Sequence, residues 1–210
     1  MFLFQRIAPL QIVKGGVIVD DWRIQDIPHN DPFYTDQAVN LLYKGFHTIT
    51  DSYRTIELAY EEVKDCMVDE RINRCVLDRN NRMMGWIGAL PQYNGNAWEL
   101  HPLIVDPNFR NLGIGRLLIT DLEHQIAKQG GCVIYLGTDD EKGLTSLYGI
   151  DLFQNLWNHI QQIRNPGNHP YTFYQKFGFQ IIGVLPDANG LGKPDIFMAK
   201  RIEHEVLRSR

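Results

Sequence analysis

Residues 109–118, FRNLGIGRLL, carry two glycines and two arginines at spacings that suit anion binding. Gly113 and Gly115 lack a Cβ atom, so the neighbouring backbone amides can approach a ligand closely. An apolar helical pattern begins directly after them, and the first amides of a helix are unpaired donors reinforced by the helix dipole. Arg110 and Arg116 add positive charge. The segment therefore predicts a phosphate site, although a tight turn that needs glycines for close packing explains the same residues.

Two familiar nucleotide motifs are excluded by the spacing of this segment. The dinucleotide pattern G-x-G-x-x-G requires a third glycine where Leu118 stands, and the P-loop requires Gly-Lys-Ser/Thr at a fixed distance after Gly113. The spacing that fits is R-x-x-G-x-G, from Arg110 to Gly115, and it follows an apolar segment at 97–106 that is typical of a strand.

Acidic residues lie within and after two of the predicted strands. Glu99 stands between apolar neighbours in WELHPL, where a carboxylate must be paired or open to a cavity. Asp139, Asp140 and Glu141 follow the apolar run 132–138. Three adjacent negative charges are tolerable in solvent and attract a polycation. A plain solvated loop explains the cluster equally well.

Three further side chains are of types that could take part in catalysis or metal binding. Tyr174, in FYQKFGF, is protonated at neutral pH and can donate a proton, although a tyrosine on a short amphipathic helix more often packs in a core. Cys132 lies within a predicted strand without a positioned base, which indicates packing. The imidazole of His101 fits no metal or triad spacing. The sequence therefore predicts neither a metal site nor a covalent nucleophile.

The composition is that of a globular protein with an acidic balance. The 210 residues are 44% hydrophobic and 22% charged, with a formal charge of -4, which disfavours nucleic-acid binding and favours a cationic partner. Cys66, Cys75 and Cys132 form no C-x-x-C, so no disulfide framework or zinc site is expected, and a reducing cytoplasm is the default compartment. Residues 1–16 are apolar but do not fit a signal peptide or a membrane span, so we expect an added arm and no membrane partner.

The spacing of apolar residues along the chain alternates between patterns typical of strands and patterns typical of helices. The first half predicts a strand at 16–24, helices at 31–46 and 52–67, and an antiparallel meander of strands at 73–79, 82–92 and 97–106. Ser52 is the predicted N-cap of the second helix, and its apolar face is expected to hold Ile56, Ala59, Tyr60, Val63 and Met67.

The second half predicts a strand–helix–strand unit, a helical insert and a final pair of strands. A helix from Ile114 to Lys128, ended by two glycines, is followed by a strand at 132–138. One or two helices are expected in the insert at 143–165 and a short helix in HPYTFYQKFGF, and strands are expected at 180–186 and 195–202.

The order of these elements and the R-x-x-G-x-G loop resemble the GCN5-related N-acetyltransferases (GNAT) from about Gly16 to Ile202. The segments WIGALPQY, WELHPL, YLGTDD, HPYTFYQKFGF, GVLPDANG and KPDIFMAK are similar to those of aminoglycoside 6'-N-acetyltransferases of the enterococcal type. This resemblance implies an α/β (α+β) fold, in which a mixed, mostly antiparallel sheet is splayed at the acetyl-CoA site and flanked by helices. It also implies acetyl-CoA as the donor.

For the donor, the resemblance implies that the strand at Leu103, Ile104 and Val105 pairs with the pantetheine arm, and that the Leu103 N–H polarises the thioester carbonyl. Tyr174 would hydrogen-bond the CoA sulfur and act as general acid. The residues that would hold the pyrophosphate are Arg110, Asn111, Leu112, Gly113, Ile114, Gly115 and Arg116.

For the acceptor, the resemblance implies that Glu99 lies at the amine and accepts its proton, directly or through water. The other residues expected to contact the acceptor are His101 through its backbone carbonyl, Asp139 and Asp140 through charge, and Phe46 and Tyr93 as apolar walls.

The expected activity is therefore direct acetyl transfer from acetyl-CoA to the 6'-amine of an aminoglycoside by a cytoplasmic homodimer, without a metal. The alternatives are the same chemistry on a polyamine or a protein amine, and a CoA-binding sensor without catalysis. The expected organisation is an arm at 1–16, one acetyltransferase domain at 17–202 with its insert at 143–165, and a tail at 203–210.

Overall fold

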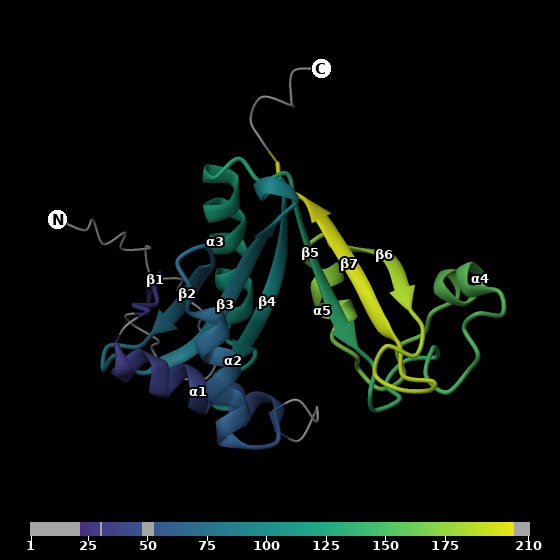
Figure 1. Cartoon of the computed structure of the whole chain (residues 1–210), viewed down its shortest axis with the longest axis horizontal. Coiled ribbons are helices and arrows are strands. Elements are labelled where there is room, and N and C mark those ends of the chain that lie inside the picture. The colour runs from purple at the N-terminus through teal and green to yellow at the C-terminus, as the bar shows by residue number, and fades with distance from the viewer. Residues whose placement is uncertain (1–21, 30, 48–52, 204–210) are drawn as a thin grey trace. The chain divides into compact units, whose positions relative to one another are not determined.

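The chain forms a seven-stranded mixed sheet in the order β1-β2-β3-β4-β5-β7-β6, shown in Figure 1. The computed structural model describes residues 22–29, 31–47 and 53–203. The strands are β1 (Arg23–Asp26), β2 (Ile72–Leu77), β3 (Met83–Gln92), β4 (Ala97–Val105), β5 (Val133–Asp139), β6 (Gln180–Leu185) and β7 (Asp195–Arg201). The helices are α1 (Pro32–Phe46), α2 (Ile56–Cys66), α3 (Ile114–Lys128), α4 (Leu156–Gln161) and α5 (Tyr171–Gln175).

The chain divides into two compact units. Unit 1 comprises residues 1–90 and 101–122, and unit 2 comprises residues 91–100 and 123–210. Strands β3 and β4 and helix α3 each contribute residues to both units. The β1–β2, β2–β3, β5–β7 and β6–β7 pairs are antiparallel, whereas β4 and β5 are parallel. The sheet is therefore mixed and mostly antiparallel, flanked by helices, as predicted.

The first two helices of unit 1 begin at side-chain caps. The Asp31 carboxylate accepts a hydrogen bond from the Phe33 amide at the start of α1. Helix α2 is capped by Thr55, whose hydroxyl accepts a hydrogen bond from the amide of Leu58. The predicted cap, Ser52, lies outside the described residues.

The buried face of α2 differs from the predicted one. Ala59, Val63 and Cys66 are buried, whereas Ile56 and Tyr60 are more than 40% exposed. The prediction was therefore right at Ala59 and Val63 and wrong at Ile56 and Tyr60, because apolar periodicity alone does not distinguish the stripe that packs from neighbouring apolar positions. The buried face of α2 includes Cys66, which belongs to the core of unit 1.

Helices cover both faces of the strands in unit 1. Trp86 of β3 is fully buried in a core cluster with Leu42 of α1 and Val63 of α2. A Cβ atom on the preceding residue, Gly85, would lie 2.8 Å from a methyl carbon of Ile114 in α3. Because successive strand residues point to opposite faces, α1 and α2 pack on one face of β3 and α3 packs on the other (Figure 1).

Unit 2 is built around the antiparallel pairing of β5, β7 and β6. Seven residue pairs join β5 to β7, from Val133–Arg201 to Asp139–Asp195. Ile134, Leu136, Ile196 and Met198 are buried along these two strands. This pairing places the last residue of β5, Asp139, beside the first residue of β7, Asp195.

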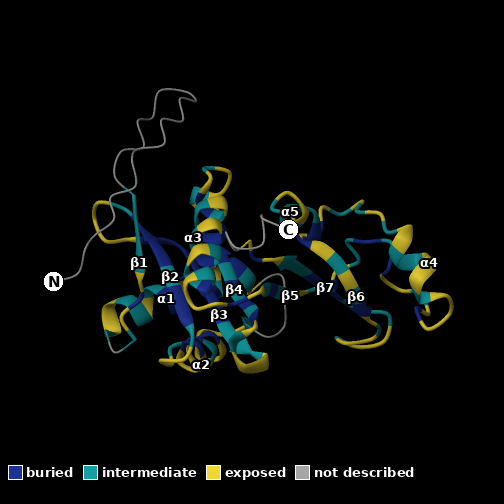
Figure 2. Ribbon diagram, turned by 90° about the horizontal axis from the view of Figure 1, so that it is seen from above, coloured by how far each residue is buried: buried dark blue, intermediate teal, exposed yellow. Residues whose placement is uncertain are grey.

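The insert at 143–165, for which one or two helices were predicted, contains one short helix, α4. Helix α4 has six residues, none of them buried, and Figure 2 shows it largely exposed. Leu147 and Leu152 are buried although they lie in turns. The apolar residues of the insert therefore pack individually through tertiary contacts, which produces a helix-like spacing without a continuous helix.

The first strand was predicted at 16–24, of which residues 16–21 lie outside the described residues, and β1 is found at Arg23–Asp26. The other elements agree with the predicted ones to within a few residues. Helix α3 runs from Ile114 to Lys128 as predicted, because an apolar stripe and terminal glycines define both ends. The arm at 1–16 and residues 204–210 of the tail lie outside the described residues. Among the helices that the structure describes, none combines the length and the apolar character needed to cross a membrane.

Candidate active site

The R-x-x-G-x-G loop of unit 1 joins β4 to α3 through a short 3-10 helix at Pro107–Phe109. Asn111 and Gly113 both have positive φ, at 63° and 90°, and α3 begins at the next residue, Ile114. A Cβ atom on Gly113 would meet nothing within 4 Å. Arg110 is exposed, as is Arg116 in the first turn of α3. Glycine is therefore required here by backbone conformation, and the space beside it is open.

A buried carboxylate holds the start of this loop. Asp106 accepts hydrogen bonds from the Asn108 amide and from the guanidinium of Arg82, both at 2.9 Å. Burial alone would raise the pKa of Asp106, but the Asn108 amide and the Arg82 cation outweigh it and lower that pKa. Arg82 also lies over the Phe109 ring at 4.7 Å. Sequence reasoning missed Asp106, although an aspartate before Pro-Asn is a typical capping signal.

The unit 1 part of β4 alternates between buried and partly exposed residues. Pro102 and Ile104 are buried, whereas His101, Leu103 and Val105 are partly exposed. The Ile104 side chain belongs to the core cluster, so the predicted donor contact could involve only its backbone. The strand thus presents Leu103 and Val105 on its less buried face.

The backbone carbonyl of His101 faces β3. A Cβ atom on Gly88 would lie 2.5 Å from this carbonyl oxygen, so the absence of a side chain at Gly88 permits the close approach of the two strands. The His101 side chain, by contrast, is 42% exposed. The imidazole is therefore partly accessible, whereas the carbonyl oxygen lies against β3.

In unit 2, Glu99 is held by a tyrosine of the neighbouring strand. Its carboxylate accepts a hydrogen bond from the Tyr135 hydroxyl at 3.2 Å, and the two residues are register partners in the parallel β4–β5 pair. Burial, reinforced by the negative Glu99, raises the pKa of Tyr135 to about 12. Tyr135 was missed by sequence reasoning because the register of a parallel pair leaves no local signal.

The residues of the predicted acidic cluster at the end of β5 differ in how far they are buried. Asp139 is exposed, whereas Asp140 is fully buried. The Asp140 carboxylate accepts hydrogen bonds from the Leu144 amide and from the amide and hydroxyl of Thr145. The expectation of a solvated cluster was therefore wrong at Asp140, whose carboxylate holds the following turn in place.

Asp195, which is not part of the predicted cluster, lies beside Asp139 in the sheet. The two are register partners at the ends of β5 and β7. Burial, together with the negative charges of Asp139 and Glu99, raises the pKa of Asp195 to about 6. Its Oδ1 atom is buried without a hydrogen-bond partner among the described residues. Sequence reasoning missed Asp195 because the β5–β7 register was unknown.

The segment that carries Tyr174 is tied to the end of β5 by a buried histidine. His169 Nε2 lies 3.0 Å from the Asp139 carbonyl oxygen, and its Nδ1 atom accepts from the Tyr171 amide. Burial lowers the pKa of His169, which favours the neutral ring that these two contacts require. The Tyr174 ring packs edge-on against Phe179, and burial raises the pKa of its phenol. Tyr174 is therefore protonated at neutral pH.

Residues 37–149, more than half of the chain, match the model of the acetyltransferase (GNAT) family. The chain belongs to the GNAT family. The predicted family, fold class and acetyltransferase assignment are thereby confirmed.

Several solved structures are similar to this GNAT chain. Two are aminoglycoside 6'-N-acetyltransferases, one complexed with coenzyme A and one from Enterococcus faecium. Each is 42% identical, over 87% of this chain and 98% of the other, with TM-scores of 0.78 and 0.77. An aminoglycoside 6'-acetyltransferase type Ii is 37% identical over the same shares, with a TM-score of 0.66. Among curated proteins, none matches the chain.

The two predicted apolar walls lie in different surroundings. Phe46, at the end of α1, packs against the core of unit 1 and lies 5.8 Å from the Tyr53 ring. Tyr93 of unit 2 is 78% exposed in a short 3-10 turn. Tyr93 thus has free ring surface, and much of the Phe46 ring is already in contact with the protein.

Unit 1 of this GNAT chain also contains a groove between α1 and α2. Val39 and Ile56 contribute apolar surface to it, and Asp36, Glu57 and Glu61 contribute three carboxylates; Asn40 and Tyr60 complete the lining. Both helices were predicted, but their acidic groove was not, because it depends on how α1 and α2 pack together.

Cys132 and Cys66 lie in different surroundings. Cys132 precedes β5 and is exposed, so its interpretation as a packing residue was wrong. Cys66 is buried at the end of α2, where its thiol lies 3.5 Å from the Glu62 carboxylate and accepts from Arg71 at 3.2 Å. Burial raises the pKa of Cys66 to about 12, so the group is a thiol at neutral pH.

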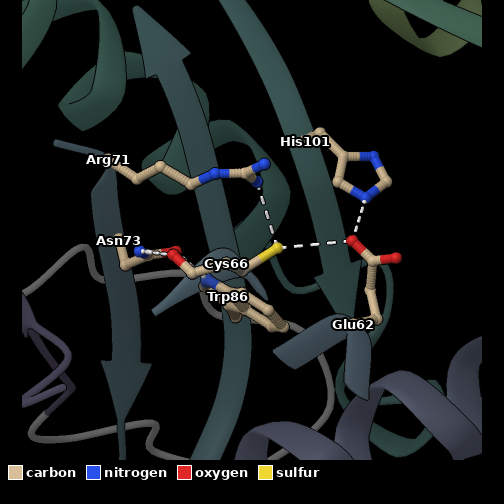
Figure 3. A network of polar contacts seen from close by, with 6 residues as sticks. All are labelled: Glu62, Cys66, Arg71, Asn73, Trp86 and His101. Atoms are coloured by element: carbon tan, nitrogen blue, oxygen red, sulfur yellow. Dashed lines mark hydrogen bonds and ion pairs between the residues drawn. The ribbon is translucent and has the colours of Figure 1, made fainter. Parts of the chain in front are cut away.

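Glu62 and Cys66 lie close to His101 in the structure, although they lie 35 or more residues before it in the sequence (Figure 3). His101 Nε2 lies 2.9 Å from a Glu62 carboxylate oxygen, and this contact is the main reason why the pKa of Glu62 is lowered. Ligand atoms of all three residues lie within 4.8 Å of one another. The sequence predicted no metal spacing for the His101 imidazole, and these three residues come together only through the fold.

Proposed function

We propose that this chain is an acetyl-CoA-dependent N-acetyltransferase that modifies the 6'-amine of aminoglycosides. The observation that carries the proposal is its 42% identity to solved aminoglycoside 6'-N-acetyltransferases over nearly their whole length. The coenzyme A complex among them supports acetyl-CoA as the donor. The unit 1 loop and the unit 2 acidic residues described above supply groups suited to the donor and to a cationic acceptor.

The donor role of unit 1 rests on the geometry of its loop. The open space at Gly113 and the start of α3 just after it suit a pyrophosphate, because unpaired amides at a helix N-terminus stabilise negative charge. Arg110 and Arg116 can contribute cations to the same segment. Acetyl-CoA supplies the acyl group as a thioester, whose carbonyl the Leu103 N–H is proposed to polarise.

The acceptor role of unit 2 rests on three carboxyl groups. Glu99, Asp139 and Asp195 interact electrostatically, and together they attract a cationic amine. Glu99 is proposed to accept the proton that makes the amine nucleophilic. Asp140 is not part of this proposal, since its carboxylate is buried and holds a turn.

The proposed reaction is a direct attack. The neutral amine nitrogen forms a bond to the thioester carbon, the carbon–sulfur bond then breaks, and the amine proton leaves toward Glu99. The Tyr174 phenol donates its proton to the departing thiolate, giving an amide and a free thiol. The raised phenol pKa supports this role, since it keeps the proton available at neutral pH.

The test is release of coenzyme A thiol from acetyl-CoA in the presence of kanamycin or tobramycin. Spermidine, a lysine peptide and an N-terminal alanine peptide serve as competing acceptors, and NMR of the product identifies the acetylated nitrogen. We expect turnover with aminoglycosides and acetylation at the 6' position. Turnover only with polyamines or peptides would replace the acceptor assignment, and coenzyme A binding without any turnover would favour the sensor.

The resemblance to these enzymes also carries the finer proposals of a cytoplasmic homodimer and of a role in antibiotic resistance. Acetyl-CoA as co-substrate supports an intracellular location. Light scattering coupled to size-exclusion chromatography tests the dimer, and a monomer at assay concentrations would contradict it. Growth of a susceptible host that expresses the chain, in the presence of kanamycin, tests the resistance role.

A further inference from the structure

Glu62, Cys66 and His101 of unit 1 bring three different metal-ligand types to one place (Figure 3). Glu62 and Cys66 are four residues apart on α2, so they lie on the same face of the helix, and His101 reaches them from β4. We propose that these three residues form a binding site for a divalent metal ion of the zinc class, separate from the acetyl-transfer chemistry.

The ligand chemistry favours zinc over calcium or magnesium. Zinc takes sulfur, nitrogen and carboxylate ligands, whereas calcium and magnesium take oxygen ligands. In a tetrahedral zinc site the bond lengths place the ligand atoms roughly 3.3–3.6 Å apart. The Cys66–Glu62 distance is 3.5 Å and the His101–Glu62 distance is 2.9 Å, and the Cys66 and His101 ligand atoms lie within 4.8 Å of each other. Side-chain movements of about 1 Å therefore convert the cluster into a three-ligand site.

Access and charge also suit an ion. The side chains of Glu62 and His101 are 29% and 42% exposed, which provides an entry route and leaves a fourth position for water. Figure 3 shows the Cys66 sulfur in contact with both the Arg71 guanidinium and the Glu62 carboxylate. Such an N–H donor to the sulfur stabilises a thiolate and orients it, as outer groups commonly do in metal sites.

Ion binding replaces the proton of the Cys66 thiol. The thiol releases its proton to water as the metal–sulfur bond forms, and the His101 nitrogen and Glu62 oxygen donate lone pairs to the ion; no oxidation occurs. The ion links α2 to β4, so the folded chain gains stability when it binds. This inference does not depend on the proposed aminoglycoside activity.

Cobalt(II) absorption tests the site with tag-free, chelator-treated protein in buffer without thiols or coenzyme A. We expect one cobalt ion per chain, visible d–d bands typical of tetrahedral coordination, and a near-ultraviolet band from the thiolate–cobalt bond. Zinc should bleach these bands. C66S should abolish the thiolate band, and C132S, which removes the exposed cysteine outside the cluster, should retain it.

Two further variants keep the test decisive if C66S folds poorly. E62Q and H101Q retain the thiol and should each weaken cobalt binding by about 10-fold or more, because each removes one of three ligands. Zinc should raise the Tm of the wild type and of C132S, and raise it less for E62Q and H101Q. No thiolate band in the wild type, or the same band in folded C66S, would overturn the proposal; the cluster would then be a hydrogen-bonded network only.

Discussion

At the scale of single residues, the proposed general acid can be separated from its neighbour on the same short helix. Y174F removes the phenol that is proposed to protonate the thiolate, so we expect kcat to fall by roughly 100-fold or more. KM for acetyl-CoA should change little, because the ring remains. Y171F is the matched control, since Tyr171 lies on the same helix α5 and loses the same hydroxyl group. Steady-state kinetics checks both variants, and equal activity of Y174F and wild type would remove Tyr174 from catalysis.

The raised pKa of Asp195 predicts a pH-dependent stability. The folded carboxyl keeps its proton up to about pH 6, whereas an unperturbed one releases it near 3.8. The native state therefore binds more protons between these values, and wild-type stability falls as pH rises through them. D195N removes this penalty, so its advantage should grow from pH 4 to pH 6 and then stay constant at about 1–2 kcal/mol, allowing for solvent screening.

Thermal unfolding of D195N and wild type at several pH values measures this difference. The difference between the variants is the relevant quantity, because other groups titrate in both. D195N should also lose affinity for a cationic amine if the carboxylate contributes to the acceptor site. A stability difference that does not change between pH 4 and pH 7 would show that Asp195 is ionised throughout this range.

These residues also show where sequence reasoning reaches its limit. Gly113 was predictable because its motif is contiguous, and the structure places it at the start of α3 with a positive φ. Tyr135 and Asp195 were not predictable, since each meets its acidic partner only through the register of β5 with β4 and β7. A shift of one residue in either pairing would turn them to the other face.

At the scale of elements, a buried amide joins α2 to β2 and β3. Asn73 donates to the Cys66 carbonyl at 2.7 Å and accepts from the Trp86 indole at 3.0 Å (Figure 3). N73A leaves both groups unsatisfied in the core, so we expect a loss of about 2–4 kcal/mol. N158A, on the exposed helix α4, is the control and should cost less than about 0.5 kcal/mol. Urea unfolding measures both, and equal stability of the two variants would contradict this role for Asn73.

The loop before α3 offers a second test at this scale. Gly113 has a φ of 90°, so G113V strains the loop and should weaken coenzyme A binding by about 10-fold or more. Gly130, at the other end of α3, has a φ of 79° and similar open space, so G130V introduces comparable strain elsewhere. Calorimetry should show weaker coenzyme A binding for G113V alone. Equal losses in both variants would indicate general damage to α3.

Element prediction succeeded where local signals agreed and failed where packing decided. Helix α3 has an apolar stripe and a glycine stop, and its bounds were predicted correctly. The insert at 143–165 has apolar residues at helical spacing, but Gly143, Gly149 and Asn155 adopt positive φ and limit α4 to six residues. The register that assembles the acidic residues of unit 2 has no local signal at all.

At the scale of the whole molecule, net charge should affect how the acceptor binds. The chain carries a formal charge of -4, and Glu99, Asp139 and Asp195 add a local negative field in unit 2. Salt between about 0.01 M and 1 M shortens the Debye length from about 30 Å to about 3 Å, which screens the attraction of a polycation. We therefore expect KM for an aminoglycoside to rise several-fold with salt while kcat changes little. Acetyl-CoA is an anion and is not attracted by these carboxylates, so its KM should not show the same rise. The quantity to measure is therefore the KM for the aminoglycoside divided by the KM for acetyl-CoA. A ratio that stays constant across this range would mean that long-range charge does not contribute to acceptor binding.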